Sequence, residues 1–479
     1  MKIKCPFKIS LFLVMIISFS SCGKEGVEPQ LLVSETELSL SMAGATSEIT
    51  VTSNDSWNIN NNASAWLQLS QTGGNSGSAT VQITAGPNAT GSTRSAVLVV
   101  TAANGQSRRV SVSQASQMYP SYNTSPKPPD ASGMSSTAVQ LADKITLGWN
   151  LGNTMEAPGG ETGWGSPVIT EDYIKFVKQN GFNAIRIPCA WNWYHVDNQA
   201  TAHIDQNWLN RVKEVVGYCV KNDMYVLLNI HWDGGWLENN CTPVKKDSVN
   251  AKQKALWEQI ATTMRDFDEH LMFASANEPN ADDATKMGVL HSYHQTFIDA
   301  VRSTGGRNTY RALVLQGAPE LFAVSSFPTD PTPNRLMYEP HNYTPFQFTT
   351  LDGDASWGKM FYYWGAGHHS TIEPDRNPTW GEEDEQLKGF KLLKENYVDK
   401  GIPVLMGEYG AYRRDGTKNI PLDLATHNDA VDYWLTYVTR QAIAHGIKPF
   451  YWDIGGALDR ANYTVKDQRT IDAILEGAK

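Results

Sequence analysis

The chain has 479 residues, of which 41% are apolar and 19% charged, a composition typical of folded domains rather than disordered chains. This length suggests two domains, at least one of them large enough for a substantial core. The formal net charge of −10 argues against non-specific binding to nucleic acid or to an anionic membrane surface. Both need a basic patch, and the sequence offers none, so we expect no nucleic-acid partner.

The first residues have the pattern of an export signal. Lysines precede the apolar stretch 9–19, which is too short to cross a bilayer as a helix. Ser20-Ser21-Cys22-Gly23 then resembles a bacterial lipobox, in which the cysteine becomes the lipidated first residue. We therefore expect residues 1–21 to be removed and Cys22 to anchor the protein at the outer membrane or cell surface. Phe19 departs from the usual aliphatic residue, which leaves a plain signal peptide as the alternative.

Residues 31–115 alternate in the period-two manner of half-buried strands and show no helical periodicity. The clearest strand-like runs are 48–52, 80–84, 96–100 and 109–113. Turn signals rich in Asn, Asp, Gly and Pro separate them. This pattern predicts a small antiparallel, immunoglobulin-like β-sandwich.

The same segment resembles a bacteroidetes carbohydrate-associated, often N-terminal (BACON-type) domain. The resemblance rests on Ser56-Trp57, Ala65-Trp66-Leu67, the run 89–94 and the final Ser113-Gln114-Ala115. It implies either glycan binding or use as a spacer. We favour a spacer, because the sequence shows no cluster of aromatic residues suited to an exposed platform.

A connecting segment follows at residues 116–136. It is rich in Tyr, Ser and Pro and includes Ser125-Pro126-Lys127-Pro128-Pro129. Proline stiffens an extended chain and removes backbone donors. We expect a linker here, leading to a second domain over residues 137–479.

In the second domain, strand-like apolar runs alternate with helical patterns. The expected strands are 145–150, 184–188, 225–230, 271–276, 313–316, 335–339, 404–407 and 449–452. Eight such units predict an α/β fold, a (β/α)8 TIM barrel with enlarged loops. A doubly wound open sheet would need a Gly-rich phosphate loop after an early strand, and the sequence has none.

Two carboxylate motifs stand at the ends of expected strands. Asn277-Glu278-Pro279 follows 271–276, and Gly407-Glu408-Tyr409-Gly410 follows 403–406. In a parallel barrel all strand ends share one face, where active sites lie. Two opposed carboxylates cleave a glycosidic bond, and Asn277 would supply a donor for the sugar 2-hydroxyl.

Other strand ends also carry polar or aromatic groups. The permanent cation of Arg186 could hold Glu408 ionised if the barrel brings them together. His341 and Tyr343 share one strand end and could orient that glutamate by hydrogen bonds. Trp452 offers a flat apolar floor for a sugar ring.

The barrel segment, from about residue 138 to the C-terminus, resembles glycoside hydrolase family five, the large cellulase family. The matching stretches are 147–154, 181–188, 277–279 and 407–410. The resemblance implies Glu278 as acid/base, Glu408 as nucleophile and retention of configuration, with the carboxyl groups about 5 Å apart. It assigns further active-site positions to Arg186, His231, Asn277, His341, Tyr343 and Trp452.

This resemblance implies an endo-β-1,4-glucanase acting on cellulose-like chains, mixed-linkage glucan or xyloglucan. Many relatives have a second histidine where this chain has Trp232, which bears on substrate preference. We expect Trp232 and Trp236 to be substrate platforms, and Glu339 to be supporting structure rather than a third catalyst. A mannanase or xylanase on the same barrel, or a non-catalytic glycan-binding protein, are the alternatives.

The sequence indicates no cofactor. It has no CxxC pair, and we expect no metal site, no cofactor and a monomer. A metal-dependent hydrolase, the third alternative, would be inhibited by chelators. Once the two N-terminal cysteines are set aside, three remain, which we expect to be buried small hydrophobes: Cys189, Cys219 and Cys241.

Overall fold

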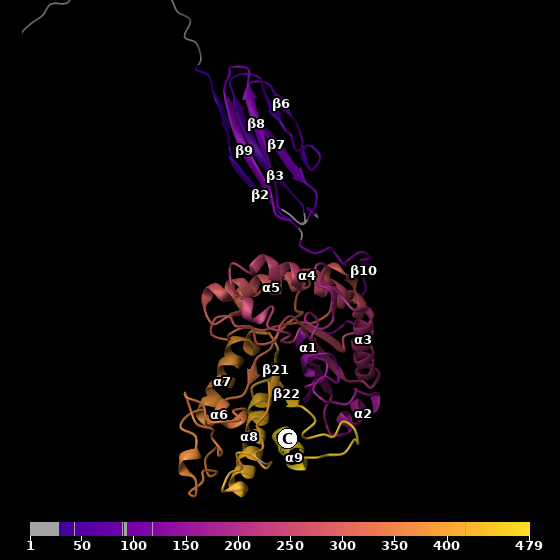
Figure 1. The fold of residues 1–479 in the computed structure, drawn as a ribbon, viewed down its shortest axis with the longest axis vertical. Coiled ribbons are helices and arrows are strands. Elements are labelled where there is room, and N and C mark those ends of the chain that lie inside the picture. Colours follow the sequence, from indigo (N-terminus) through magenta and orange to yellow (C-terminus); the bar gives the residue numbers. More distant parts are fainter. Residues whose placement is uncertain (1–27, 43, 89, 91–92, 117, 417) are drawn as a thin grey trace, which may run out of the picture. The chain divides into compact units, whose positions relative to one another are not determined.

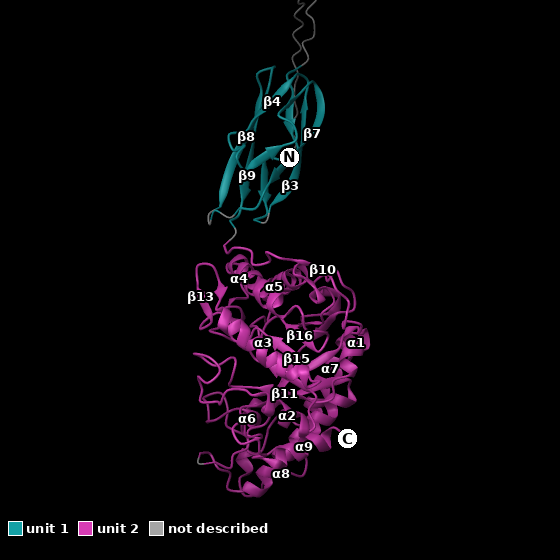
Figure 2. Cartoon of the chain, turned by 90° about the vertical axis from the view of Figure 1, so that its right-hand side faces the viewer, with its two compact units in different colours: residues 1–117 teal, residues 118–479 magenta. Residues whose placement is uncertain are grey.

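The structure is a computed structural model that describes residues 28–479 except 43, 89, 91–92, 117 and 417. The chain divides into two compact units with the boundary between Gln117 and Met118 (Figure 2). The expected signal and Cys22 lie outside the described residues. Within the described part of the chain, every helix is too short or too polar to cross a bilayer.

The first unit is a two-sheet sandwich. One sheet has the order β1-β3-β7-β5 and the other β2-β9-β8-β4-β6. Its strands are β1 (Leu31–Val33), β2 (Glu37–Leu40), β3 (Ala45–Ser53), β4 (Trp57–Asn60), β5 (Leu67–Leu69), β6 (Gly73–Gly74), β7 (Gly77–Ala85), β8 (Arg94–Ala102) and β9 (Ser107–Gln114). The expected sandwich is confirmed, and all four expected runs are strands.

One strand pair of the sandwich differs from the expected antiparallel pattern. β1 pairs with β3 in the first sheet, whereas β2 pairs in parallel with β9 in the second, with Leu38 opposite Val112. The chain therefore changes sheets between β1 and β2 and runs alongside the last strand in the same direction. Trp57 is buried in the core, and partly buried Trp66 lies under the guanidinium of Arg94, 4.4 Å from the ring centre.

The second unit is a closed parallel barrel, as expected (Figure 1). Strand pairing runs β19-β18-β16-β15-β12-β11-β22-β21, and a β19–β21 pairing closes the ring. The barrel strands are β11 (Gly148–Leu151), β12 (Ala184–Ile187), β15 (Tyr225–Asn229), β16 (Leu271–Ala274), β18 (Leu313–Leu315), β19 (Leu336–Tyr338), β21 (Val404–Tyr409) and β22 (Ile447–Asp453), with β20 (His341–Asn342) extending the wall beside β21.

Helices lie around the barrel, and most of them cover its outer face. They are α1 (Ala138–Asp143), α2 (Glu171–Gln179), α3 (Gln206–Lys221), α4 (Lys246–Met264), α5 (Ala284–Ser303), α6 (Phe346–Thr349), α7 (Glu383–Asn396), α8 (Leu424–Ala444) and α9 (Gln468–Gly477). Short strands form two further pairs, β10 (Lys127–Pro129) with β17 (Gly305–Gly306) and β13 (Val196–Asn198) with β14 (His203–Ile204). The three cysteines of this unit are free and buried, as expected.

The interior of the barrel is apolar at the end where the strands begin. Met272, Leu405 and Phe450 point into one cluster with Leu141 and Ala142 of α1. A capping box between Thr137 and Gln140 starts this helix. The helix thus closes the N-terminal end of the barrel with hydrophobic side chains.

The structure corrects the expected linker over 116–136. From residue 118 onward this segment belongs to the barrel unit. The backbone N–H groups of Tyr122 and Asn123 donate to the buried carboxylate of Glu258, at 2.6 and 3.1 Å, and β10 pairs with β17. The buried carboxylate of Glu258 needs donors, and the extended segment supplies them.

Candidate active site

The strand ends bring the predicted site residues together at one end of the barrel. Cα pairing sets His341 of β20 opposite Glu408 of β21, and Asn150 of β11 opposite both Arg186 and Trp452. The loop after β16 then adds Asn277 and Glu278. Parallel strands place these side chains on a common face, which is the end where barrel enzymes carry their active sites.

Arg186 lies at the centre of this group and is fully buried. Its guanidinium contacts Glu408 Oε1 at 2.7 Å, Glu339 Oε1 at 2.8 Å and the Asn277 side-chain oxygen at 2.7 Å. Burial alone would lower the pKa of Arg186, but the charges of Glu339 and Glu408 raise it above its ordinary value. The cation therefore holds three partners in fixed positions.

Glu408 is nearly buried, with its side chain 7% exposed. One carboxylate oxygen contacts Arg186, and the other accepts a hydrogen bond from the Tyr343 hydroxyl at 2.9 Å. Burial, together with the neighbouring charge of Glu408, raises the pKa of Tyr343 well above its usual range, so this hydroxyl keeps its proton and donates. Both oxygens of Glu408 are thus oriented.

Glu278 is much more accessible, with its side chain 58% exposed. Its Oε1 contacts His341 Nδ1 at 2.8 Å, and this hydrogen bond lowers the pKa of Glu278. Its backbone has φ +49° and its N–H donates to Gln316 Oε1 at 2.7 Å. A positive φ at a residue other than glycine stores strain, which the surrounding contacts must maintain.

His341 lies between the two glutamates. Burial lowers the pKa of His341, but the negative charge of Glu408 and the bonds to Glu278 and Glu339 outweigh it and raise the pKa to about 9. Its Nε2 lies 3.2 Å from Glu339 Oε1, and its Nδ1 lies 3.7 Å from Glu408. The imidazole is therefore protonated at neutral pH.

One carboxylate oxygen of Glu278, one ring nitrogen of His341 and one carboxylate oxygen of Glu408 all lie within 4.8 Å of one another. An oxygen of each glutamate is thus within reach of a single sugar ring. Such a group could bring donor atoms to a metal ion. The adjacent cation of Arg186 and the proton on His341 oppose a further positive charge at this place.

Glu339 is the fully buried counter-ion of both cations. The charges of Arg186 and His341 lower the pKa of Glu339 although burial opposes this. Its position depends on Gly407, where a Cβ atom would lie only 2.0 Å from Glu339 Oε1. The glycine before Glu408 therefore leaves room for the carboxylate that sequence analysis interpreted as supporting structure.

Two further residues of this group were not predicted, and both end barrel strands. Asn150 donates to the Gly407 carbonyl at 2.8 Å and accepts from Arg186 at 3.0 Å. Gln316 follows β18 and contacts both Glu278 and His341. The available signal was a polar residue near the C-terminal end of an apolar strand run, inside β11 for Asn150 and directly after β18 for Gln316.

His231 and Trp452 form a nearly parallel pair, with ring centroids 6.0 Å apart and an interplanar angle of 11°. Burial, with the nearby charges of Arg186 and His341, lowers the pKa of His231 well below its usual range, so the ring is neutral. In the loop that follows, Trp232 is 48% exposed. Trp236 instead packs against the core, with the Lys252 ammonium 5.6 Å from its ring centre.

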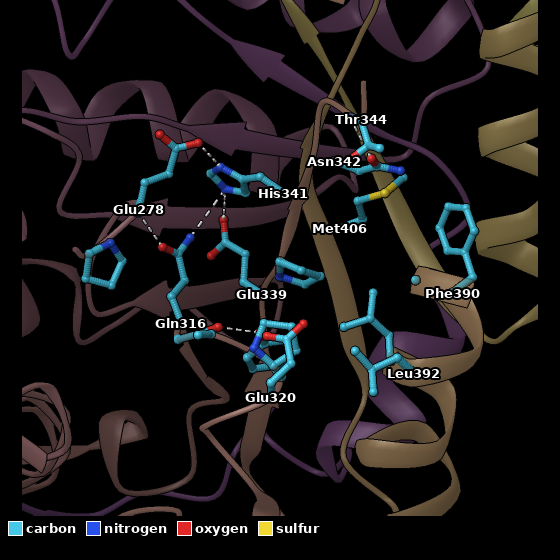
Figure 3. Close-up of a pocket in the computed structure, with 18 of the residues that line it drawn as sticks. Glu278, Gln316, Glu320, Glu339, His341, Asn342, Thr344, Phe390, Leu392 and Met406 are labelled. Atoms are coloured by element: carbon cyan, nitrogen blue, oxygen red, sulfur yellow. Dashed lines mark hydrogen bonds and ion pairs between the residues drawn. The ribbon is translucent and has the colours of Figure 1, made fainter. Parts of the chain in front are cut away.

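A cavity of about 510 Å³ opens beside Glu278 (Figure 3). Gln316, Glu339 and His341 lie next to Glu278 in its wall, and residues of α7, including Phe390, close the far side. Glu408 and Trp452 do not line it. The cavity therefore adjoins only one of the two catalytic candidates and lies on the β18–β19 side of the barrel.

Comparison with known proteins agrees with this geometry. The family described as cellulase (glycosyl hydrolase family 5) matches residues 150–458, and the family described as putative binding domain, N-terminal (BACON) matches residues 55–115. A xyloglucan-specific endo-β-1,4-glucanase of Bacteroides ovatus is 30% identical over 98% of this chain and 96% of its own length. Endoglucanase A of Paenibacillus barcinonensis is 32% identical over 71% of this chain and 90% of its own.

Solved structures give the same result. The Bacteroides ovatus family 5 xyloglucanase in complex with a XXXG heptasaccharide has a TM-score of 0.68 and 30% identity, covering 94% of this chain and all of that one. A xyloglucan-specific β-1,4-glucanase from a ruminal metagenomic library, in complex with XXLG, has a TM-score of 0.65 and 37% identity over 72% of this chain and 96% of its own. The chain therefore belongs to glycosyl hydrolase family 5, a family of retaining glycosidases.

Proposed function

We propose that this protein is a retaining endo-β-1,4-glucanase in which Glu408 is the nucleophile and Glu278 the acid/base. The observation that carries the proposal is the approach of the two carboxylates, with an oxygen of each within 4.8 Å of the other. Retaining enzymes need carboxyl groups about 5 Å apart, whereas inverting enzymes leave a gap of about 6.5–9.5 Å for a water molecule.

In the first step, Glu408 attacks the anomeric carbon and the glycosidic oxygen leaves with the proton of Glu278. Arg186 and Tyr343 orient the attacking carboxylate by contacts to its two oxygens. Asn277, fixed by Arg186, is placed to bind the 2-hydroxyl of the sugar. Trp452 and His231 form the floor of the same subsite.

In the second step, water hydrolyses the glycosyl-enzyme ester while Glu278 accepts its proton. The lowered pKa of Glu278 in the free protein suits this base role. The acid role needs a proton on the same group. Substrate that covers this exposed carboxylate would remove water from it and raise its pKa, because burial disfavours the charged form.

For the substrate we propose a β-1,4-linked glucan, with xyloglucan as the first candidate. The support is the likeness to two xyloglucan-specific relatives over most of the barrel and the cavity beside Glu278, which offers room near the cleavage point. Trp232 stands where many relatives have a second histidine, and we expect it to influence which glucan is preferred near the cleavage point.

This proposal is tested by incubating the protein with xyloglucan, mixed-linkage glucan, carboxymethylcellulose, mannan and xylan. Product sizes are then measured, and the anomer released first is identified by proton NMR. We expect internal cleavage of the glucans with the β-anomer first. Preferred hydrolysis of mannan or xylan would overturn the substrate assignment, and an α-anomer would overturn the mechanism.

We also propose export and lipid anchoring through Cys22, supported by the signal pattern and by the N-terminal sandwich as a spacer. Labelling with a palmitate analogue tests the anchor in cells that express the full chain. Incorporation that is lost in Cys22→Ser is expected. Labelling unchanged by that substitution, or absent in the wild type, would contradict lipidation at this residue.

A further inference from the structure

One histidine of α5 takes no part in the catalytic geometry described above. His294 is fully buried, and it contacts the two residues that directly follow neighbouring barrel strands. Its Nδ1 lies 2.7 Å from the hydroxyl oxygen of Ser275, after β16, and its Nε2 lies 2.7 Å from the backbone oxygen of Gln316, after β18. A helix on the outer side of the barrel therefore joins two strand ends at the face that carries the site.

The two partners of His294 determine where its ring carries the proton. A backbone carbonyl can only accept, so Nε2 carries a hydrogen and donates it to Gln316. Burial lowers the pKa of His294 to about 4, although the bond to Gln316 opposes this, and the ring is neutral at neutral pH. The unprotonated Nδ1 then accepts the hydroxyl proton of Ser275. Both ring nitrogens are thus used, each in a fixed role.

These two hydrogen bonds close a ring of contacts around the acid/base candidate. Glu278 follows Ser275 by three residues, and its backbone N–H donates to Gln316 Oε1 at 2.7 Å. The side chain of Gln316 lies next to both Glu278 and His341 (Figure 3). His294 therefore holds the chain on both sides of this contact, through Ser275 before Glu278 and through the backbone of Gln316 itself.

The two glutamates depend on their surroundings in different ways. Glu278 has a strained backbone with φ +49°, and its side chain is 58% exposed, so its place is set largely by the contacts of its backbone. Glu408 is nearly buried and is held through its side chain by Arg186 and Tyr343, which come from other strand ends. A change in the backbone contacts of Glu278 should therefore disturb the acid/base and spare the nucleophile.

We propose that His294 is a positioning residue for proton transfer by Glu278, acting through Ser275 and Gln316. It is fully buried and meets no substrate. A misplacement of about 1 Å at a reacting group can cost roughly 100-fold in rate, so bonds that fix the backbone there matter to the chemistry. The inference rests on the proposed glucanase function and adds that a helix outside the barrel controls the acid/base without acting on the nucleophile.

The test uses the full chain and His294→Phe, which keeps a ring and removes both hydrogen bonds. Two substrates are compared, phenyl β-cellobioside, whose leaving group needs a proton, and 2,4-dinitrophenyl β-cellobioside, whose leaving group does not. In the variant, kcat/KM for the phenyl substrate should fall roughly 100-fold. The value for the dinitrophenyl substrate should change by less than about threefold. A loss of folded protein alone would lower both values equally, so the ratio separates positioning from stability.

The second step of the reaction gives an independent readout. Water that attacks the glycosyl-enzyme ester needs Glu278 as a base, whereas azide is already an anion and needs none. In His294→Phe, azide should raise kcat on the dinitrophenyl substrate and displace Glu408 to give β-cellobiosyl azide, and in the wild type it should do neither. His294→Gln, whose amide can still donate to Gln316, should recover most of the wild-type ratio between the two substrates.

His427→Phe is the matched control, because His427 is an equally buried histidine on another helix, α8. Its ring accepts from the backbone N–H of Arg414 at 2.8 Å and donates to the carbonyl of Tyr362 at 2.6 Å. Burial lowers the pKa of His427 to about 4 as well. This variant should keep the wild-type ratio between the two substrates, whatever it costs in stability.

Ser275→Ala is a smaller change that removes one bond of the same ring. It should lower kcat/KM for the phenyl substrate roughly tenfold more than for the dinitrophenyl substrate. Equal losses on both substrates in folded His294→Phe, or in Ser275→Ala if His294→Phe does not fold, would overturn the positioning role but leave the glucanase assignment standing. Failure of the wild type to hydrolyse any β-glucan or aryl cellobioside would refute the proposed function itself.

Discussion

The two ends of the barrel differ in what they bury. At the end where the strands begin, α1 covers an interior of Met272, Leu405 and Phe450, all apolar. At the opposite end, Arg186, Glu339 and Glu408 are buried as charged groups. Burying charge is expensive unless it is paired, and replacing such pairs by apolar groups often stabilises a protein. The difference indicates that one end serves stability and the other chemistry.

The largest effect should come from Glu408→Gln, which removes the proposed nucleophile while keeping its size. We expect kcat on β-glucan to fall by at least about 10⁴-fold, because the covalent route needs this nucleophile. Glu278→Gln should cost as much with natural substrates but less with a 4-nitrophenyl leaving group, which needs little protonation. Initial rates on both substrates measure this. Turnover near the wild-type level in either variant would contradict the assignment.

Glu339→Gln should lower kcat roughly 100-fold, since a preorganised charge near the reacting atoms is worth about that much. The variant should also shift the alkaline limb of the pH–rate profile downward. In the wild type the pKa of His341 is raised to about 9. Protonation of His341 therefore stabilises the folded protein, and this stabilisation is complete at pH values below the pKa of histidine in the unfolded chain. It is lost as the pH rises through about 9.

The pH profile distinguishes this role of Glu339 from simple packing. Loss of the Glu339 charge lowers the pKa of His341, so the stability and activity of the variant should decline at lower pH than in the wild type. Thermal unfolding and kcat recorded between pH 6 and about pH 10 measure both. A variant that is slower but has an unchanged alkaline limb would argue that Glu339 only fills space.

Leu141→Ala probes the other end of the barrel. Removing a buried leucine side chain should lower the free energy of unfolding by about 3 kcal/mol. Because Leu141 packs in the apolar cluster at the end of the barrel opposite the site, kcat per folded molecule should stay at the wild-type value. Urea unfolding and active-site titration test this pair of outcomes. A large loss of kcat in folded Leu141→Ala would contradict the proposal that this end of the barrel serves stability alone.

Among the variants of the site, Tyr343→Phe should have the smallest effect, roughly a tenfold lower kcat, because one hydrogen bond to a charged group is lost. Arg186 would still hold the other oxygen of Glu408. Steady-state kinetics on a soluble β-glucan provide the measurement. An effect as large as that of Glu408→Gln would mean that Tyr343 takes part directly in bond breaking.

The barrel could be predicted from the sequence because the barrel strands are buried on both sides. Each strand therefore appears in the sequence as a short apolar run that ends in polar residues. The site at those ends followed from the same pattern, including the contact of Arg186 with Glu408. Strands as short as β1 and β5 of the sandwich gave no alternation to detect. The packing of 118–136 depends on a distant buried carboxylate, Glu258, which local sequence does not reveal.

The contact of Trp193 with the loop after β15 was missed for a similar reason. Asp233 joins this loop to the one that carries Trp193 through hydrogen bonds to the backbone of Trp191 and Asn192, a tertiary contact without a local signal. Trp236, expected as a platform beside Trp232, packs inward instead. Loop tryptophans share one residue type, and only the fold decides which of them face the solvent.

The central claim, that Glu408 is the nucleophile and faces Glu278 across one sugar ring, is tested most directly by trapping the covalent intermediate. A 2-deoxy-2-fluoro-β-cellobioside with a good leaving group slows the second step, so the labelled enzyme can be digested and the modified peptide sequenced by mass spectrometry. The account predicts a single adduct on the carboxylate of Glu408. An adduct on Glu278, Glu339 or any other residue would contradict it.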